Sequence, residues 1–240
     1  MTQVVLGTLE PERVRVEGDD ARHLAQSLRL AVGDSFVATD GQGGVARLEA
    51  SALDRRGIDA RVIERARVPQ PALRIWLVAG AEGGRGDWIV EKAVELGAFG
   101  FAPLGAATRG RLERWKRVAR AGLKQSLSAW ELAFLTGRPA LEEARERANG
   151  VGAPFAAWVA EPGGAPVLAQ ALPAQGDLFL VCGPPGGFPP GQREAWEALP
   201  GASRVDLGPL RLRAETAAIV LLAAAALRRP GSRPAAGPGP

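Results

Sequence analysis

From residue 73 onward, apolar runs of strand length alternate with segments of helical periodicity, and this alternation constrains the fold more than any other feature. Strands are predicted at LRIWLVA (73–79), FGFAPL (99–104), FAAWVA (155–160), LFLVCG (178–183) and SRVDLG (203–208). Asp87 can cap a helix over DWIVEKAVELG that Gly97 ends, and LERWKRVARAGLKQSL (112–127) forms a second, basic helix. Strands separated by helices predict an α/β fold with a mainly parallel sheet covered on both faces.

The last predicted helix, about 213–229, is almost wholly apolar. A helix that is apolar all round is buried, either in the core or at a subunit interface. Its longest apolar run, 217–227, is too short to span a bilayer, and the first residues show no secretory signal. We therefore expect a cytoplasmic protein with no membrane partner.

The first 67 residues have a different pattern, with short β segments and turns. A hairpin is predicted from strand 36–39, the glycine-rich turn 40–44 and strand 45–50, followed by a strand at 58–63. One short helix is expected at 23–30. VPQP at 68–71 reads as a linker, because proline blocks regular structure. The predicted division is a domain at 1–68, a domain at 72–229 and a disordered tail at 230–240.

Cysteine and histidine are too scarce for several kinds of site. Cys182 is the single cysteine and His23 the single histidine. An internal disulfide and a Cys/His zinc site are therefore excluded, and no metal is expected. The formal net charge is +4 and the sequence pI about 10.1, with arginine supplying most of the positive charge. Arginine suits phosphate and base recognition because its planar fork donates in pairs.

LFLVCGPPGGF, residues 178–188, is the first motif that carries chemistry. A buried strand that runs into a glycine-rich turn presents backbone N–H and C=O groups with no Cβ in the way. Ligands of open α/β sheets lie beyond such carboxyl strand ends. The pattern is neither a Walker loop nor GxGxxG, which argues against a phosphate or NAD site. Taken alone, it is equally compatible with a purely structural turn.

VDLGPLRLRAETAAIVLLAAAAL, residues 205–227, is the second motif. Glu215 in the first turn of the apolar helix is favoured by the helix dipole. Arg213 is not, because a cation at a helix N-terminus is unfavourable without an anionic partner. Arg213 is therefore either a functional residue or the partner of Glu215.

Together these motifs resemble the uracil-N3 methyltransferases of 16S ribosomal RNA in the SPOUT superfamily, whose pattern runs GPEGG-F, then LG-x-R-I-L-R-x-E-T-A. Two more stretches agree with the family and extend the resemblance over nearly the whole chain. WIVEKAVELGAFGFAPL matches through Lys92, Glu95, Leu96, Gly97 and Pro103, and RHLAQSLRLAVGD matches through His23, Leu24, Leu28, Arg29, Gly33 and Asp34.

The resemblance implies an N-terminal PUA-like β-barrel, a C-terminal trefoil-knotted SPOUT methyltransferase domain and a homodimer with the last helix at its interface. It implies S-adenosylmethionine held by backbone groups of the knot loops. The residues expected to bind the cofactor are Leu180, Val181, Cys182, Gly183, Pro184, Gly186, Gly187, Asp206, Leu207, Gly208, Leu212, Thr216 and Ala217.

The basic helix is the third motif, and it points to RNA. Arg117, Arg120 and Lys124 fall at three- and four-residue spacing and share one face, with Trp115 on the opposite side. A solvated helix face is the plain alternative, but a one-signed stripe is typical of binding to a phosphate backbone. The residues expected to contact ribosomal RNA, free or in the small subunit, are His23, Arg29, Lys92, Arg109, Arg117, Arg120, Lys124 and Gln125.

Several family positions carry different residues here. Pro185 replaces the glutamate of GPEGG, Leu210 stands at the first arginine of R-I-L-R, Ser128 replaces the arginine of Q-S-G-R, and Arg85 stands near the expected lysine. Cofactor binding, which relies on backbone and glycine, should depend less on these positions than catalysis or target choice.

Methylation of uracil N3 requires loss of its proton, and a cation stabilises the resulting anion. Arg213 is the first candidate for that role, followed by Arg211 and by Arg29, while Glu215 either orients Arg213 or binds RNA. The expected activity is S-adenosylmethionine-dependent methylation of a ribosomal uridine. The alternatives are another RNA base or ribose as target, and an RNA-binding protein of ribosome assembly that has lost turnover.

Overall fold

The computed structural model describes residues 3–80, 84–150 and 154–229. Among these, residues 3–70 and 123–131 form one compact unit, and residues 71–122 and 132–229 form a second. The break at residue 70 falls within the VPQP segment. The tail predicted at 230–240 lies outside the described residues.

The first unit is built on a five-stranded mixed sheet. The strands are β1 (Gln3–Val5), β2 (Arg13–Glu17), β3 (Ser35–Thr39), β4 (Gly44–Leu53) and β5 (Gly57–Arg67), in the order β1-β3-β4-β5-β2. β1 runs parallel to β3, and the other pairs are antiparallel. The predicted hairpin is confirmed, since Thr39 pairs with Val45 across the glycine-rich turn.

The helix of this unit begins earlier than the sequence predicted. α1 (Gly18–Arg22) continues into a π-helical turn, η1 (His23–Ser27), so the prediction of 23–30 was wrong at both ends. Asp19 and Asp20 occupy the first turn, where the helix dipole favours carboxylates. Leu24 is fully buried, whereas Leu28, which shares its helical spacing, is 47% exposed.

The second unit contains a six-stranded sheet in which every pairing is parallel, as predicted. Its strands are β6 (Leu73–Ala79), β7 (Gly100–Pro103), β8 (Ala133–Phe134), β9 (Phe155–Pro166), β10 (Gly176–Cys182) and β11 (Ala202–Asp206), in the order β11-β9-β10-β6-β7-β8. All residues of β10 are buried. Such continuous burial is typical of a parallel strand covered on both faces.

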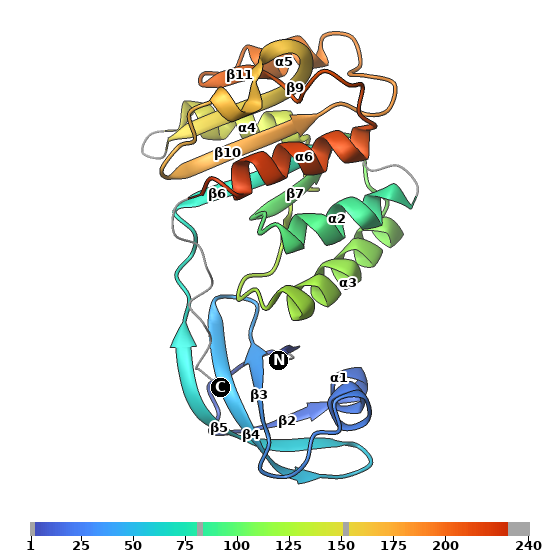
Figure 1. Cartoon of the computed structure of the whole chain (residues 1–240), viewed down its shortest axis with the longest axis vertical. Helices are drawn as coiled ribbons and strands as arrows, with labels where there is room; N and C mark the ends of the chain where they lie inside the picture. The colour runs from blue at the N-terminus through green and yellow to red at the C-terminus, as the bar shows by residue number, and fades with distance from the viewer. Residues whose placement is uncertain (1–2, 81–83, 151–153, 230–240) are drawn as a thin grey trace. The chain divides into compact units, whose positions relative to one another are not determined.

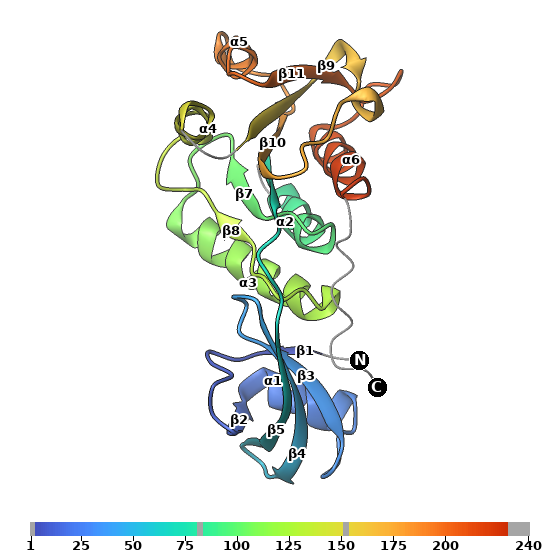
Figure 2. The same cartoon turned by 90° about the vertical axis from the view of Figure 1, so that its left-hand side faces the viewer.

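Helices cover both faces of this sheet (Figures 1 and 2). The helices are α2 (Arg85–Glu95), α3 (Arg109–Ser126), α4 (Ala140–Asn149), α5 (Gln192–Glu197) and α6 (Ala214–Ala226), with a 3-10 turn, η2 (Val167–Ala169). One apolar core lies under α2, α3 and α6, and a second lies under α4 and α5. Side chains that alternate along β6 and β10 enter the two cores in turn.

α2 differs from its prediction at the start and agrees at the end. It begins at Arg85, so Asp87 lies in the first turn and does not cap the helix. The Asp87 carboxylate instead accepts a 2.5 Å hydrogen bond from Arg114 of α3. Gly97, at φ +68°, ends the helix as predicted, and Ala98 donates its N–H to the carbonyl of Ala93.

α6 buries one side within its own unit. Ala218, Leu221, Leu222 and Ala225 are fully buried, which agrees with the core, one of the two positions predicted for this helix. Val220 is 37% exposed, and Leu227, just after the helix, is 84% exposed. Among the described residues, no helix combines the length and apolarity needed to cross a membrane.

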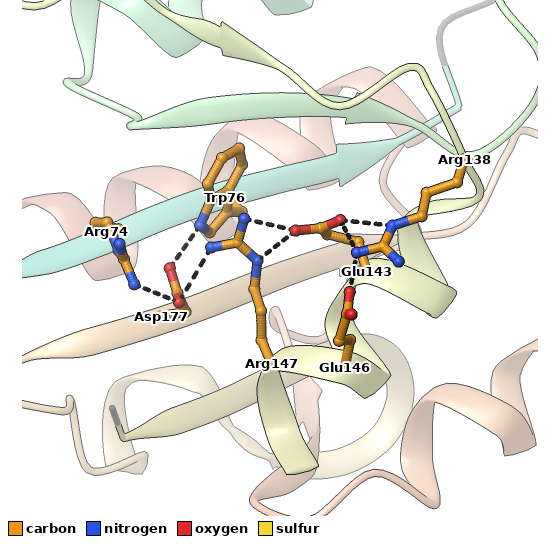
Figure 3. Close-up of polar contacts among 7 residues, drawn as sticks. All are labelled: Arg74, Trp76, Arg138, Glu143, Glu146, Arg147 and Asp177. Atoms are coloured by element: carbon orange, nitrogen blue, oxygen red, sulfur yellow. Dashed lines mark hydrogen bonds and ion pairs between the residues drawn. The ribbon is translucent and has the colours of Figure 1, made fainter. Parts of the chain in front are cut away.

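A network of charged side chains lies toward the amino ends of β6 and β10 (Figure 3). The Asp177 carboxylate, nearly buried, accepts hydrogen bonds from Arg74 (2.6 Å), the indole N–H of Trp76 (2.8 Å) and Arg147 (3.2 Å). The Arg147 guanidinium also stacks 4.8 Å from the Trp76 ring centre. Arg147 donates to Glu143 of α4, which also pairs with Arg138. These bonds satisfy a charge that would otherwise destabilise the core.

Candidate functional site

The loop after β10 carries the GPPGG motif and closes in a tight turn. The N–H of Gly187 donates to the carbonyl of Pro184 over 2.8 Å, which places Pro185 at the second position of a β-turn. Proline suits that position because its fixed φ matches the turn and its missing N–H is not used there. Gly187 has φ +86°, a conformation that glycine adopts without strain.

This loop approaches the carboxyl end of β6 closely. A Cβ on Gly80, directly after β6, would lie 2.8 Å from Cα of Pro184. Gly80 is therefore required for the two strand ends to pack together. The contact fixes the start of the GPPGG loop against the sheet.

The loop after β11 is ordered by a carboxylate. Asp206 accepts the N–H of Gly208 (2.7 Å) and the N–H of Gly163 (2.9 Å). These two bonds, that of Gly208 first, hold the pKa of Asp206 below its ordinary value. Gly163 belongs to a part of β9 that the sequence did not predict, where the pairing with β11 shifts from Val159 to Ala165. The Pro-Gly-Gly run at 162–164 was the available signal.

Arg213 stands at the start of α6 as its N-cap residue, with φ −68° and ψ 152°. Its side chain is exposed and forms no ion pair with any described residue. Glu215, whose side chain is only 14% exposed, instead faces Arg85 at the start of α2, with 3.5 Å between Nε and the carboxylate. The alternative in which Arg213 is the partner of Glu215 was therefore wrong.

The residues predicted to bind a cofactor gather in the loops after β10 and β11, at the same edge of the sheet. Leu180, Val181 and Cys182 lie within β10 with their side chains in the cores, so they offer only backbone groups. Burial raises the pKa of the Cys182 thiol to about 12, which excludes a thiolate nucleophile near neutral pH. Asp206 is the last residue of β11, and the other members are loop or helix-start residues: Gly183, Pro184, Gly186, Gly187, Leu207, Gly208, Leu212, Thr216 and Ala217.

The residues predicted to bind RNA are divided between the two units. His23, Arg29, Lys124 and Gln125 belong to the first unit, and Lys92, Arg109, Arg117 and Arg120 belong to the second. Arg29 has φ +54°, a left-handed conformation that is uncommon outside glycine. It is also exposed.

Two of these cations are held by carboxylates within their own unit. The Lys92 ammonium contacts Glu91 (2.7 Å) and Glu95 (2.9 Å), and these bonds, that of Glu91 first, raise the pKa of the lysine. Lys124 pairs with Asp20. Arg117 differs from both, since it is exposed and forms no ion pair with a described residue.

A cavity of about 260 Å³ opens at the same edge of the sheet. It lies where β6, β7 and β10 end, and its lining includes Gly80, Leu104, Pro184, Arg111 and Trp115 of α3, and Gln192 of α5. The helical periodicity assigned Trp115 to the buried face of α3, which is correct, but it gave no sign that this face borders a cavity. Gln192 was not predicted at all. Among the described residues, no group of three metal-ligating side chains is present.

Known families match both units. Residues 69–226 match the model of an RNA methyltransferase domain, and residues 16–63 match an RNA methyltransferase PUA domain. The ribosomal RNA small subunit methyltransferase E of Mycobacterium bovis is 33% identical, over 87% of this chain and 84% of the relative. The protein of the same name from Bacillus subtilis is 24% identical, over 87% and 88%.

Solved structures show the same fold. A probable rRNA methyltransferase from Porphyromonas gingivalis superposes with a TM-score of 0.75 at 26% identity, over 92% of this chain and 94% of that one. A ribosomal RNA small subunit methyltransferase E from Neisseria gonorrhoeae, solved with S-adenosyl methionine, gives 0.77 at 24% identity, over 93% and 96%. The predicted fold class, a SPOUT-type α/β domain with an N-terminal PUA-like domain, is confirmed.

Proposed function

Because this chain belongs to the ribosomal RNA small subunit methyltransferase E family, we propose that it transfers a methyl group from S-adenosylmethionine to N3 of a uridine in small-subunit ribosomal RNA. The observation that carries the proposal is the collection of open glycine loops at one edge of the parallel sheet, together with Arg213, which has no ion pair with any residue that the structure describes. Ligands of such sheets bind at this edge.

The loops after β10 and β11 fit a nucleoside cofactor. A Cβ built on Gly186, Gly187 or Gly208 would meet no atom within 4 Å, so their backbone borders open space. S-adenosylmethionine supplies an electrophilic methyl group when bound there. Gly186 then offers its N–H and its carbonyl to it, and Gly187 and Gly208, whose N–H groups already bond to Pro184 and Asp206, offer their carbonyls. Asp206 holds its own loop in shape.

Arg213 stabilises the uracil anion that forms when N3 gives its proton to solvent water. A cation at a helix N-cap is disfavoured by the helix dipole, so its guanidinium is available for an anion from outside the chain. Arg211, also exposed, lies two residues before it and supports the same role. Glu215 acts through Arg85 rather than through Arg213, and this pair fixes the start of α6 against the start of α2.

RNA binding rests on the one-signed face of α3 and on Arg29 of the first unit. Arg117 and Arg120 are both exposed on α3 and contribute to attraction of the phosphate backbone. Lys92 and Lys124 exchange their carboxylate partners for phosphates when RNA binds. The reaction takes place in the cytoplasm, where small ribosomal subunits are available.

The protein acts as a homodimer through the exposed apolar residues of its second unit. Trp88 of α2 is 42% exposed, Val220 of α6 is 37% exposed, and Leu227 after α6 is 84% exposed. Exposed apolar side chains are typical of a subunit interface where they gather in one patch, and α2 and α6, which carry Trp88 and Val220, are in contact. Sedimentation of the purified protein should therefore give twice the mass of the chain.

A methyl-transfer assay tests the function directly. Small ribosomal subunits that lack the modification are incubated with the protein and S-adenosylmethionine labelled in its methyl group. Incorporation of label, followed by mass spectrometry that places it on uracil N3, supports the proposal. Label on another base or on ribose would show that the protein methylates a different target. Binding of subunits without any transfer would indicate an assembly protein.

A further inference from the structure

Two buried polar atoms at the cavity between β6, β7 and β10 have no hydrogen-bond partner among the described residues. One is the indole N–H of Trp115, a residue that is only 1% exposed. The other is the side-chain carbonyl Oε1 of Gln192. Both residues line the cavity. Buried polar groups are almost always paired, so an unpaired donor and an unpaired acceptor on two residues beside one cavity point to a polar ligand, whose entry would have to turn these atoms toward it.

A cationic side chain also lines the cavity. Arg111, one turn before Trp115 on α3, lines it and forms no ion pair with a described residue. Prolines, glycines and Leu104 supply most of the remaining lining. The site thus combines a donor, an acceptor and a guanidinium with an apolar lining. A planar ring with carbonyl groups and an attached anionic group meets all of these requirements.

The position of the cavity relates it to the proposed cofactor loops. Pro184 lines the cavity and is also the first residue of the turn that Gly187 closes. The cavity therefore adjoins the GPPGG loop without including Gly186 or Gly187. Enzymes that modify a base take it out of the stack into a pocket and read its polar edge. The volume of about 260 Å³ suits one nucleotide rather than a larger ligand.

We propose that this cavity receives a pyrimidine nucleotide of the substrate RNA, with the Trp115 indole N–H donating a hydrogen bond to a ring carbonyl, Gln192 Oε1 accepting a hydrogen bond from an N–H or O–H of the nucleoside and Arg111 facing its phosphate. The inference rests on the proposed function and adds to it the residues that select the nucleotide. Trp115 and Gln192 are specificity residues, since they hydrogen-bond groups that differ among nucleotides.

Nuclear magnetic resonance of the indole N–H groups tests the site without any need for turnover. Uridine 5′-monophosphate is added to the ¹⁵N-labelled full chain, and the Trp115 signal is identified by its absence in Trp115→Phe. The expected result is a saturable shift of the Trp115 signal, which persists with S-adenosylmethionine at saturation. Adenosine 5′-monophosphate should produce a much smaller shift.

Trp196 provides a matched control. Its indole N–H is also buried and without a partner among the described residues, but Trp196 does not line the cavity. Its signal, identified with Trp196→Phe, should not move when uridine 5′-monophosphate binds. If the chemical shift of the Trp115 signal does not change on addition of uridine 5′-monophosphate, as expected if only water fills the cavity, the proposal is overturned. An equal response to the adenosine nucleotide, or displacement of the uridine nucleotide by S-adenosylmethionine, also overturns it.

Kinetics supply a second readout. Trp115→Phe and Gln192→Leu should each raise KM for the ribosomal subunit or lower kcat by about tenfold, the effect of one lost hydrogen bond. Their affinity for S-adenosylmethionine should stay unchanged, and Trp196→Phe should retain wild-type kinetics. Equal losses in Trp115→Phe and Trp196→Phe would mean that packing alone is affected. If the wild-type chain transfers no methyl group, the proposed function fails, and the resonance experiment still decides this inference.

Discussion

The two ends of the parallel sheet treat charge in opposite ways. Toward the amino ends of β6 and β10, Asp177 is nearly buried and accepts bonds from Arg74, Trp76 and Arg147. At the carboxyl ends, Arg213 is exposed and without an ion pair among the described residues. Polar groups that pair with one another stabilise the fold, whereas groups left open are available to ligands. Along β10, the paired charge of Asp177 is five residues, roughly 16 Å, from the carboxyl end of the strand, where the open groups lie. The groups that stabilise the fold and the groups available to ligands are therefore at opposite ends of the same strands.

Removal of the Asp177 carboxylate should have the largest effect. Asp177→Ala leaves three donors without their acceptor in a nearly buried place, and should lower the free energy of unfolding by ~3–5 kcal/mol. Urea denaturation measures the loss. Glu146→Gln, at the exposed end of the same network, serves as control and should cost at most about 1 kcal/mol. Equal losses in both variants would remove the distinction between the two ends.

Arg213→Gln should give the opposite result, with a large loss of activity and a stable fold. We expect kcat to fall about 10²–10³-fold, the range for loss of one group that stabilises a developing anion. The free energy of unfolding should rise by a few tenths of a kcal/mol, roughly, because an unfavourable charge leaves the helix N-terminus. Methyl-transfer assays and urea denaturation on the same preparation test both halves. A variant that loses stability in parallel with activity would show that Arg213 stabilises the fold rather than the reacting anion.

Much of the second unit is predictable because its signals are local. The periodicity of β6, β10 and α3 and the Gly97 stop follow from neighbouring residues. Asp177 and Trp76 stand 101 residues apart, so no local pattern reveals their bond. The cavity escapes prediction for the same reason, since α3, α5 and three strand ends build it. Within the site, the sequence left Glu215 open as a partner of Arg213, but Glu215 pairs with Arg85, which is remote from it in sequence.

The two kinds of charge also occur side by side on α3. Arg117→Ala should flatten the salt dependence of RNA binding by about one unit of log–log slope, because one phosphate contact is lost. Lys124→Ala should change this slope less, since Asp20 already holds its ammonium. Titrations at several salt concentrations measure both. A larger effect for Lys124→Ala would show that an existing ion pair does not reduce a contribution to RNA binding.

The smallest effect on stability is expected for Asp206. This carboxylate is paired with two N–H groups, although it lies at the carboxyl ends of the strands, where Arg213 forms no ion pair with a described residue. Its folded pKa is lowered by the N–H groups of Gly208 and Gly163, so its contribution is present above the unfolded pKa. That contribution is lost as pH falls through the folded pKa. Asp206→Ala should therefore unfold like the wild type at strongly acidic pH and be slightly less stable at neutral pH. A difference that does not depend on pH would assign the effect to lost packing.

The turn at Pro184–Gly187 has a consequence for how such chains diversify. Its geometry is held by the bond from the Gly187 N–H to the Pro184 carbonyl, and the second position of such a turn accepts residues other than proline. The exposed side chain at position 185 can thus be exchanged while the backbone of the turn keeps its conformation. A lineage can exchange it and alter the chemistry offered to substrate while the loop beneath keeps its shape. Target choice is then free to drift at a position where the fold imposes little selection.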